Sequence, residues 1–169
     1  MNIKEKHFEV ILSDYQDMIY RLCCSYVANG DLRKDLYQNI LIRIWKGLDS
    51  FENRSSITTW IYRIAVNSSL DFLRKESKNK HLSNLLEINE ADIIDNSIHI
   101  EENLILSEKM KFIYRCINKL TFIDKTVMSL YLEDLSYKKI SEIVGISEKN
   151  VSVKLTRIKK KLNTCLRDN

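Results

Sequence analysis

The stretch LSYKKISEIVGISEKNVSVKLTRIKKKL, residues Leu135–Leu162, predicts two helices that meet at a single glycine. Ser136 is a suitable N-cap for the first helix, whose apolar residues recur at helical spacing up to Val144. Gly145 follows, where a tight turn needs a positive φ that glycine adopts at little cost. Ser147 is a suitable N-cap for the second helix. The stretch therefore predicts a helix-turn-helix motif.

The second helix has two faces of different chemistry. Its inner stripe is apolar and consists of Val151, Leu155, Ile158 and Leu162. Its outward face is mostly polar and consists of Lys149, Asn150, Ser152, Val153, Thr156, Arg157 and Lys160. In a helix-turn-helix such a face enters the DNA major groove, where basic groups meet phosphates and amide, hydroxyl and guanidinium groups meet base edges. The alternative is a solvated basic face on an ordinary helical hairpin. The glycine turn, the serine cap and the apolar stripe together favour DNA binding.

Two features around this motif support the same interpretation. Between Lys149 and Lys161 the chain carries six basic residues and no acidic one, which suits the phosphate backbone of a nucleic acid. Upstream, Thr121 with Asp124 three residues later begins a further helix, predicted over Ile123–Glu133. We expect this helix to pack across the other two.

The composition of the whole chain predicts an all-α fold. The 169 residues include no proline and only three glycines, and 44% are apolar, which is enough for a core. No run of 18 uncharged apolar residues occurs, so we expect no membrane insertion. The N-terminal segment carries acids through its apolar part and lacks a small-residue cleavage site. We therefore expect no secretory signal and a cytoplasmic protein.

Charge is distributed unevenly along the chain. Residues 1–86 have a net charge of +3, residues 87–108 of −7, and residues 109–169 of +8. Basic segments on either side of an acidic one point to a polyanionic partner for the ends of the chain.

The acidic middle also predicts a domain boundary. Its periodicity is poor and it is rich in Asn, Asp, Glu and Ser, so we predict a flexible linker over residues 77–103, with at most a short helix at Leu82–Leu86. Two small helical domains, residues 1–76 and 104–169, would flank the linker. The alternative is a surface loop within a single domain.

A second helical segment, TWIYRIAVNSSLDFLRK, runs from Thr59 to Lys75. Its apolar face consists of Ile61, Tyr62, Ala65, Val66, Leu70, Phe72 and Leu73. The opposite stripe consists of Trp60, Arg63, Asn67, Asp71 and Arg74. A large aromatic ring among guanidinium and amide groups suits an unstacked base, which needs a planar face and polar edge contacts. The alternative is that Trp60 is a core residue at the domain edge, sheltered by Ile57 and Ile64.

The cysteines and histidines lack the spacing of a metal site. Cys23 and Cys24 are adjacent, whereas zinc ligands usually have two to four residues between them. We expect these two cysteines, Cys116 and Cys165 to be reduced thiols. The three histidines lie far apart in the sequence, and none is next to a plausible nucleophile. The sequence therefore predicts no metal, no cofactor and no catalytic residue.

Over nearly its full length the chain resembles the extracytoplasmic-function group of bacterial RNA polymerase sigma factors. DLYQNILIRIWKGLDSF (Asp35–Phe51) is similar to the region 2 signature that grips the polymerase. The Thr59–Lys75 segment is similar to the helix that opens and reads the promoter −10 element. LEDLSYKKISEIVGISEKNVSVKLTRIKKKL (Leu132–Leu162) is similar to the region 4 reader of the −35 element. The resemblance implies a two-domain transcription initiation factor, a monomer when free, with RNA polymerase core, promoter DNA and an anti-sigma factor as partners.

The resemblance also assigns roles to residues. Asn67 occupies the position of a base-contacting amide in the family motif R-I-A-x-N, and Trp60 would stack on a base or wedge the duplex edge. The loop Glu52–Thr58 (ENRSSIT) corresponds to the family's specificity loop around the extruded base. Contacts to the −10 element are expected from Trp60, Arg63, Asn67, Arg74, Asn53 and Ser55. Contacts to the −35 element are expected from the outward face of the second helix of the helix-turn-helix.

Core polymerase binding is expected from Asp35, Leu36, Gln38, Asn39 and Ile42. The family commonly has Gln-Glu where this chain has Gln38–Asn39, which removes one charge from the contact. Ordinary amphipathic packing is an alternative explanation for the apolar positions Leu36, Ile40 and Ile44. Where many relatives have Leu-Pro, this chain has Leu120–Thr121, and threonine caps a helix well.

Two other classes of function are weaker alternatives. A stand-alone helix-turn-helix regulator would need a dimer interface or a ligand pocket, and the sequence gives no sign of either. A nucleic-acid hydrolase would need clustered carboxylates or histidines at consistent spacing, and we find none. We therefore expect a protein that is not an enzyme.

Overall fold

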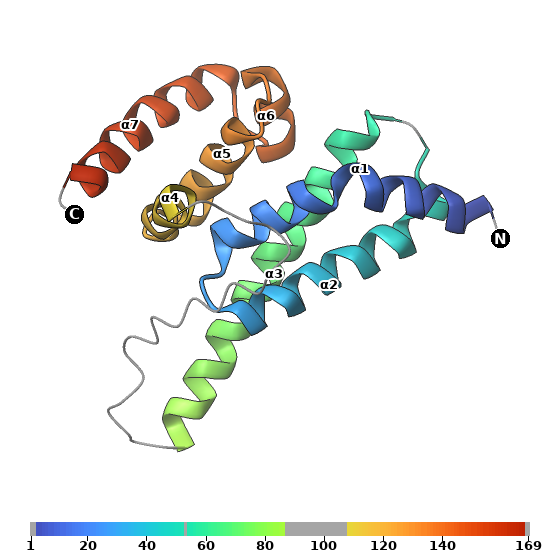
Figure 1. Cartoon of the computed structure of the whole chain (residues 1–169), viewed down its shortest axis with the longest axis horizontal. Coiled ribbons are helices and arrows are strands. Elements are labelled where there is room, and N and C mark those ends of the chain that lie inside the picture. Colours follow the sequence, from blue (N-terminus) through green and yellow to red (C-terminus); the bar gives the residue numbers. More distant parts are fainter. Residues whose placement is uncertain (1–2, 53, 87–107, 168–169) are drawn as a thin grey trace.

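The computed structural model describes residues 3–52, 54–86 and 108–167, and the regular secondary structure in these ranges is helical (Figure 1). The N-terminal part consists of α1 (Ile3–Tyr26), α2 (Gly30–Gly47), the short 3₁₀ helix η1 (Leu48–Ser50) and α3 (Ile57–Leu86). The C-terminal part consists of α4 (Glu108–Asn118), α5 (Phe122–Leu132), α6 (Tyr137–Val144) and α7 (Glu148–Arg167). The predicted all-α fold is confirmed.

The first three long helices form a bundle around an apolar core. On α2 the side chains of Leu36, Ile40 and Ile44 are completely buried, because their spacing of four residues places them on one face of the helix. Ile61 and Ala65 of α3 are completely buried as well. Burial of aliphatic side chains of this size typically stabilises a fold by about 1.5–3 kcal/mol each.

The corner between α1 and α2 is closed by side-chain hydrogen bonds. The Asn29 side chain accepts the N–H of Leu32 at 3.0 Å and caps the start of α2. Arg33 is buried, and its guanidinium donates to the carbonyls of Val27 at 3.1 Å and Ala28 at 2.7 Å. These bonds give hydrogen-bond donors to the carbonyls of the two residues that follow α1 and lead into α2.

The caps and the glycine turn of the C-terminal helices lie where the sequence predicts, whereas α4 was not predicted and α7 continues beyond Leu162 to Arg167. Thr121 caps α5 by accepting the N–H of Asp124, and Ser136 caps α6 by accepting the N–H of Lys139. Gly145 has φ 77° and ends α6 in the left-handed conformation. Ser147 then accepts the N–H of Asn150 at 3.2 Å at the start of α7. The helix-turn-helix prediction is thereby confirmed as a fold.

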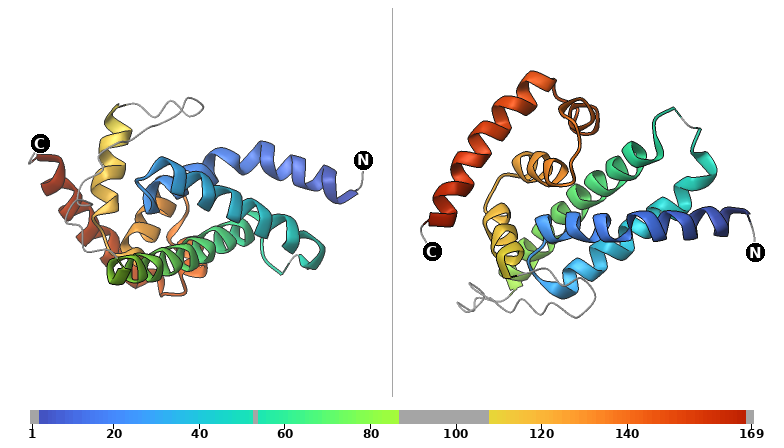
Figure 2. Two further views of the ribbon diagram at one scale, coloured as in Figure 1. Left: turned by 90° about the horizontal axis from the view of Figure 1, so that it is seen from below. Right: turned by 45° about the horizontal axis from the view of Figure 1, so that its top comes forward.

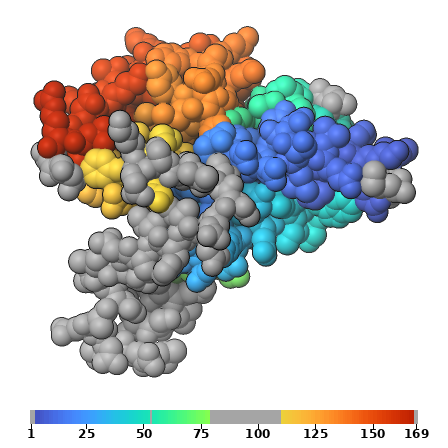
Figure 3. All heavy atoms as spheres, in the orientation of Figure 1, coloured from blue at the N-terminus to red at the C-terminus, as the bar shows by residue number. Residues whose placement is uncertain are grey.

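The two halves of the chain pack against each other. Helix α1 contacts α4 and α5, and α3 contacts α6 (Figures 1 and 2). The Tyr26 hydroxyl lies 2.6 Å from that of Thr126, and the Tyr26 ring stacks on Phe122 with centroids 5.0 Å apart. The Asn118 amide donates to the Cys24 carbonyl at 3.0 Å. In the space-filling view part of the C-terminal half lies against α1, whereas α7 lies farther away (Figure 3).

The end of α3 differs from the sequence prediction. The helix continues without a break from Ile57 to Leu86, so residues 77–86, which we assigned to the linker, are helical. The stretch lacks glycine and proline, so nothing in it forces the helix to stop at residue 76. Residues 87–103 of the predicted linker lie outside the described ranges.

The prediction of four reduced cysteines is wrong for one pair. Cys116 of α4 and Cys165 of α7 form a disulfide with a Cα–Cα distance of 6.1 Å. The sequence positions lie 49 residues apart, so spacing alone gives no sign of the pairing. Cys23 and Cys24 are free thiols in the core, and burial raises the pKa of both.

Candidate nucleic-acid interface

The polar stripe of α3 lies on the surface as predicted. Arg63, Asn67 and Arg74 are exposed, while Ile61 and Ala65 on the other side of the helix are buried. The structure therefore separates the two faces of this segment in the way its helical period requires.

Trp60 packs at the edge of the bundle core, and part of its ring remains accessible to solvent. The ring is half-buried, and it packs against Phe51 with ring centroids 4.9 Å apart. It also covers Gly47, where an added Cβ would lie 2.9 Å from Trp60 Cζ2. The indole is thus held at the edge of the bundle by the end of α2 and the following turn.

A hollow of about 320 Å³ opens beside this ring. It is lined by Ser50, Phe51, Glu52, Arg54, Ser55, Trp60 and Arg63. Two aromatic faces, two guanidinium groups, hydroxyl groups and a carboxylate suit a flat ligand with polar edges and a nearby anionic group, which describes a nucleotide. Ser55, predicted from the loop, lies in this wall, whereas Asn53 lies outside the described residues.

Two members of the α3 stripe are engaged within the protein. The Arg63 guanidinium donates to the backbone carbonyl of Glu142 on α6 at 2.9 Å. Asp71 accepts a hydrogen bond from Arg43 of α2 at 2.9 Å. In this arrangement a predicted DNA-contacting side chain is therefore bound by the other half of the chain.

The predicted DNA face of α7 is presented to solvent. All of its members are exposed, namely Lys149, Asn150, Ser152, Val153, Thr156, Arg157 and Lys160. The inner stripe of Val151, Leu155, Ile158 and Leu162 is buried against α5 and α6. This burial fixes which side of α7 faces outward.

Three of the six basic residues between Lys149 and Lys161 contact groups of the protein itself. Lys154 lies 2.8 Å and Lys161 3.8 Å from the carboxylate of Asp124 on α5. Lys159 donates to the Tyr131 hydroxyl at 2.9 Å and lies over the Tyr131 ring. Some residues of the basic run therefore hold α7 on α5, and the others give the outward face its positive charge. The sequence alone did not reveal this division.

The ion pairs of Asp124 predict a pH-dependent contribution to stability. Burial tends to raise the pKa of Asp124, but the hydrogen bond and charge of Lys154 outweigh it, and the pKa is lowered. A lowered carboxyl pKa stabilises the fold above the unfolded value, and this contribution is lost as the pH falls through the folded value. We expect Asp124→Asn to lower the free energy of unfolding by about 1 kcal/mol at pH 7, and by less at pH 3.

Urea unfolding of both proteins at the two pH values measures this difference. Asp134→Asn is a matched control, since Asp134 is exposed and its positive φ of 56° suits asparagine. A loss for Asp124→Asn that stays the same at pH 3 would show that the carboxylate charge is not its cause.

The predicted polymerase-binding residues of α2 lie on one face, with one exception. Asp35, Gln38 and Asn39 are exposed, and Ile42 is 52% exposed although it is apolar. Leu36 is completely buried in the core of the bundle. Its assignment as a docking residue is therefore wrong in this structure, and the alternative of amphipathic packing explains Leu36 together with Ile40 and Ile44.

Sequence reasoning missed the ionic contact between the two halves. Arg21 of α1 donates from Nε and Nη2 to the two carboxylate oxygens of Glu133, each at 2.6 Å. The hydrogen bond to Glu133 raises the pKa of Arg21. The two residues lie 112 positions apart, so no local pattern signals the pair. Such bidentate contacts are among the stronger ion pairs.

Metal-binding clusters and membrane-spanning helices are both absent from the part of the chain that the structure describes. There, no cluster of three or more His, Cys, Asp or Glu side chains is arranged to hold a metal ion. None of the described helices is both long enough and apolar enough to cross a membrane.

Two families of protein domain match the chain. Residues 11–79 match the family described as Sigma-70 region 2, and residues 113–162 match the family described as Sigma-70, region 4. The first segment contains α2 and the polar stripe of α3, and the second contains α5, α6 and the outward face of α7.

Whole proteins are similar to the chain as well. It is 30% identical over 167 residues to the ECF RNA polymerase sigma factor SigW of Bacillus subtilis, covering 95% of this chain and 89% of that protein. It is 30% identical over 166 residues to the ECF RNA polymerase sigma-E factor of Escherichia coli, covering 94% and 86%.

Solved structures share the fold. The sigma factor RpoE of Bartonella quintana, in complex with the anti-sigma factor NepR, superposes with a TM-score of 0.76 at 21% identity, covering 96% of this chain and 98% of that one. CnrH, in complex with the cytosolic domain of CnrY, superposes with a TM-score of 0.66 at 16% identity, covering 98% and 90%.

Proposed function

The chain belongs to the extracytoplasmic-function group of RNA polymerase sigma factors. From this premise we propose which of its surfaces contact each part of the promoter. It is a transcription initiation factor that directs RNA polymerase. A stand-alone helix-turn-helix regulator is not favoured, because the chain matches both sigma regions in order.

We propose that α3 and the adjoining turn read the −10 element. An unstacked base would enter the hollow beside Trp60, where it meets an aromatic face and the guanidinium of Arg63. Asn67 would bond a base edge, because its amide both donates and accepts, and Arg74 would hold a phosphate. Ser55 and Asn53 would contribute from the loop before α3. The observation that carries this assignment is the hollow next to the exposed stripe of α3.

We propose that the outward face of α7 reads the −35 element in the major groove. Lys149 and Lys160 would contact phosphates, and Asn150, Ser152, Thr156 and Arg157 would meet base edges. Val153 is exposed and apolar, which suits contact with a thymine methyl group. The assignment is supported by the burial of the opposite stripe, which fixes the orientation of α7.

We propose that the chain is organised as two DNA-reading modules, one ending with α3 at Leu86 and one expected at residues 104–169, with the linker shortened to the residues between them. The protein would act in the cytoplasm, as a monomer when free, and without catalytic chemistry of its own. Two similar solved structures are sigma factors bound to NepR and to the cytosolic domain of CnrY, which supports an anti-sigma factor as a further partner.

Capture of RNA polymerase core by the tagged protein tests the function and the proposed docking face of α2. We expect Ile42→Glu to weaken capture roughly tenfold, because it places a charge in an apolar contact. Val10→Glu on α1 is the matched control, since Val10 is also apolar and exposed, at 59% against 52% for Ile42. Equal capture by both variants would remove Ile42 from the interface, and no capture by the parent would contradict the function.

Gel shifts with promoter DNA complete the test. The free protein should bind duplex promoter DNA weakly, and tight sequence-specific binding should require polymerase core. Tight binding by the protein alone would point back to the stand-alone regulator.

A further inference from the structure

We propose that Cys116 and Cys165 form a reversible redox-modification site, which exchanges with low-molecular-weight thiols and disulfides and thereby changes the stability of the C-terminal helices. The structure holds the pair as a disulfide between α4 and α7, with Cα atoms 6.1 Å apart, inside the usual range of about 4.4–6.8 Å. This site goes beyond promoter recognition and uses none of the residues assigned to DNA.

The four cysteines differ in how accessible they are. Cys23 and Cys24 are 0% and 3% exposed, and burial raises the pKa of both, so these thiols are poor nucleophiles. Cys116 is also buried, at 3%. Cys165 is partly exposed near the end of α7, and it is therefore the sulfur that a small reagent reaches first.

The surroundings of Cys165 favour exchange at this sulfur. The ammonium of Lys119 lies 4.0 Å from Cys165 Sγ, and a positive charge beside a sulfur stabilises a thiolate. Cys116 lies on the far side of the bond, where it can act as the resolving thiol. An accessible cysteine beside a resolving cysteine is typical of redox-sensing pairs.

The chemistry balances with a low-molecular-weight disulfide as the oxidant. The Cys165 thiolate attacks one sulfur of the disulfide, forming a mixed disulfide and releasing one small thiolate. Cys116, deprotonated, then attacks Cys165 Sγ and releases the second small thiolate. Two protein thiols are oxidised to one disulfide, and one small disulfide is reduced to two thiols. Reduction by small thiols is the reverse.

The position of the bond indicates what it changes. It closes a segment of 49 residues that contains α5, α6 and most of α7, so it restricts the unfolded chain over nearly the whole helix-turn-helix half. Cys165 lies eight residues beyond Arg157 and three beyond the buried Leu162, on the inner side of α7. The bond therefore changes stability without altering the outward face.

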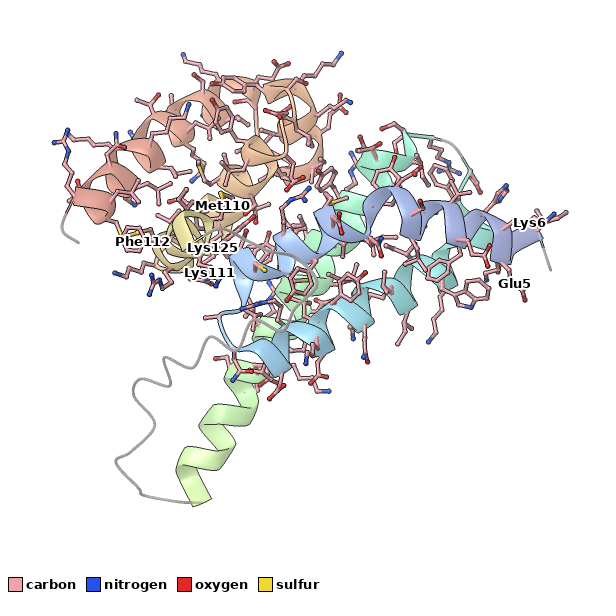
Figure 4. The ribbon with its side chains drawn as sticks, in the orientation of Figure 1. Glu5, Lys6, Met110, Lys111, Phe112 and Lys125 are labelled. Carbon is pink, nitrogen blue, oxygen red and sulfur yellow. A yellow bond between two sulfur atoms is a disulfide. The ribbon has the colours of Figure 1, made fainter. Side chains whose placement is uncertain are left out.

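Figure 4 shows α4, one of the two helices that the bond joins, with three of its residues labelled. Met110, Lys111 and Phe112 lie on α4, and Lys125 lies on α5, which contacts α4. Burial lowers the pKa of Lys125. Glu5 and Lys6 mark the opposite end of α1, away from α4 and α7. Oxidation thus affects the end of the molecule where α4 and α7 meet, and a cytosolic disulfide of this kind is typically transient.

Thiol mapping and thermal unfolding of the full-length protein test the site. The protein is reduced, incubated without oxygen in mixtures of reduced and oxidised glutathione, alkylated and digested for mass spectrometry. We expect peptides cross-linked between Cys116 and Cys165 at oxidising ratios, with Cys23 and Cys24 alkylated only after denaturation. The oxidised form should melt on the order of 10 °C higher than the reduced form.

Variants separate the pair from the other cysteines. Cys165→Ser should melt at the same temperature under oxidising and reducing conditions, because it cannot form the bond. The double variant Cys23→Ala/Cys24→Ala should keep the difference between the two conditions. Each variant is compared only with itself, so a general loss of stability in the variant does not affect the result. Four free thiols in every mixture, dimers linked between molecules, or an undiminished difference in Cys165→Ser would overturn the proposal. The assay contains no polymerase or DNA, so its failure would leave the proposed function standing.

Discussion

Replacing Trp60 with alanine is expected to reduce open-complex formation about tenfold or more. If the ring stacks on an unstacked −10 base or wedges the duplex edge, its loss removes on the order of 1–3 kcal/mol per base. The ring also packs on Phe51 and covers Gly47, so we expect some loss of stability as well. A promoter with a pre-melted bubble should restore part of the activity if the ring acts as a wedge.

The same experiment distinguishes Trp60 from Asn67. Asn67 is exposed and lies opposite the buried face of α3, so Asn67→Ala should leave the fold intact. Strand opening and the −10 base preference should suffer, and a bubble should rescue little, because the base must still be read. Closed-complex formation through α7 should survive in both variants.

Permanganate footprinting on duplex and bubble templates measures both effects. Trp45→Ala is the matched control, because Trp45 is also half-buried but packs on Phe8 at a distance from the hollow. If Trp45→Ala reduces opening as much as Trp60→Ala does, the effect is one of stability. Unchanged opening and base preference in Asn67→Ala would remove the stripe from the mechanism.

The second large effect is expected on α7, where Arg157→Ala should weaken recognition at particular −35 bases. Arg157 is exposed near the middle of α7, and we expect a bidentate contact with a guanine there to contribute roughly 1–3 kcal/mol of discrimination. Lys160→Ala should instead weaken binding evenly across promoter sequences and lower the salt dependence, as the loss of a phosphate contact does.

Holoenzyme binding to a set of −35 variants at two salt concentrations separates these outcomes. The two substitutions are matched, because both remove one exposed positive charge from the same helix. If both variants lose the same factor on every promoter, Arg157 does not read a base.

The local features of the fold were predictable because they depend on residues that are close in sequence. The caps at Thr121, Ser136 and Ser147 and the turn at Gly145 follow from the preferences of single residues. The exposed faces of α3 and α7 follow from helical periodicity, since burying one stripe fixes the other. These features were enough to place most of the candidate site.

The features that were missed join parts of the chain that are distant in sequence. Nothing local identifies Glu133 as the partner of Arg21, or Cys165 as the partner of Cys116. The use of Lys154 to bind Asp124 depends on how α7 sits on α5, which periodicity does not give. Leu36 was misassigned for a related reason, because a family motif mixes residues that face a partner with residues that hold the helix in place.

The contact between α1 and α5 sets a limit on the affinity of the free protein. Elements named −35 and −10 lie about 25 base pairs apart, or roughly 85 Å at about 3.4 Å per base pair. A compact body of 169 residues has a radius of gyration of only about 15 Å, so a closed molecule does not reach both elements. We therefore expect only an open form to bind both elements; an open fraction of about 1%, for example, would weaken the apparent affinity about a hundredfold, or roughly 2.7 kcal/mol. A partner that holds the halves apart restores this affinity without adding a single contact to DNA.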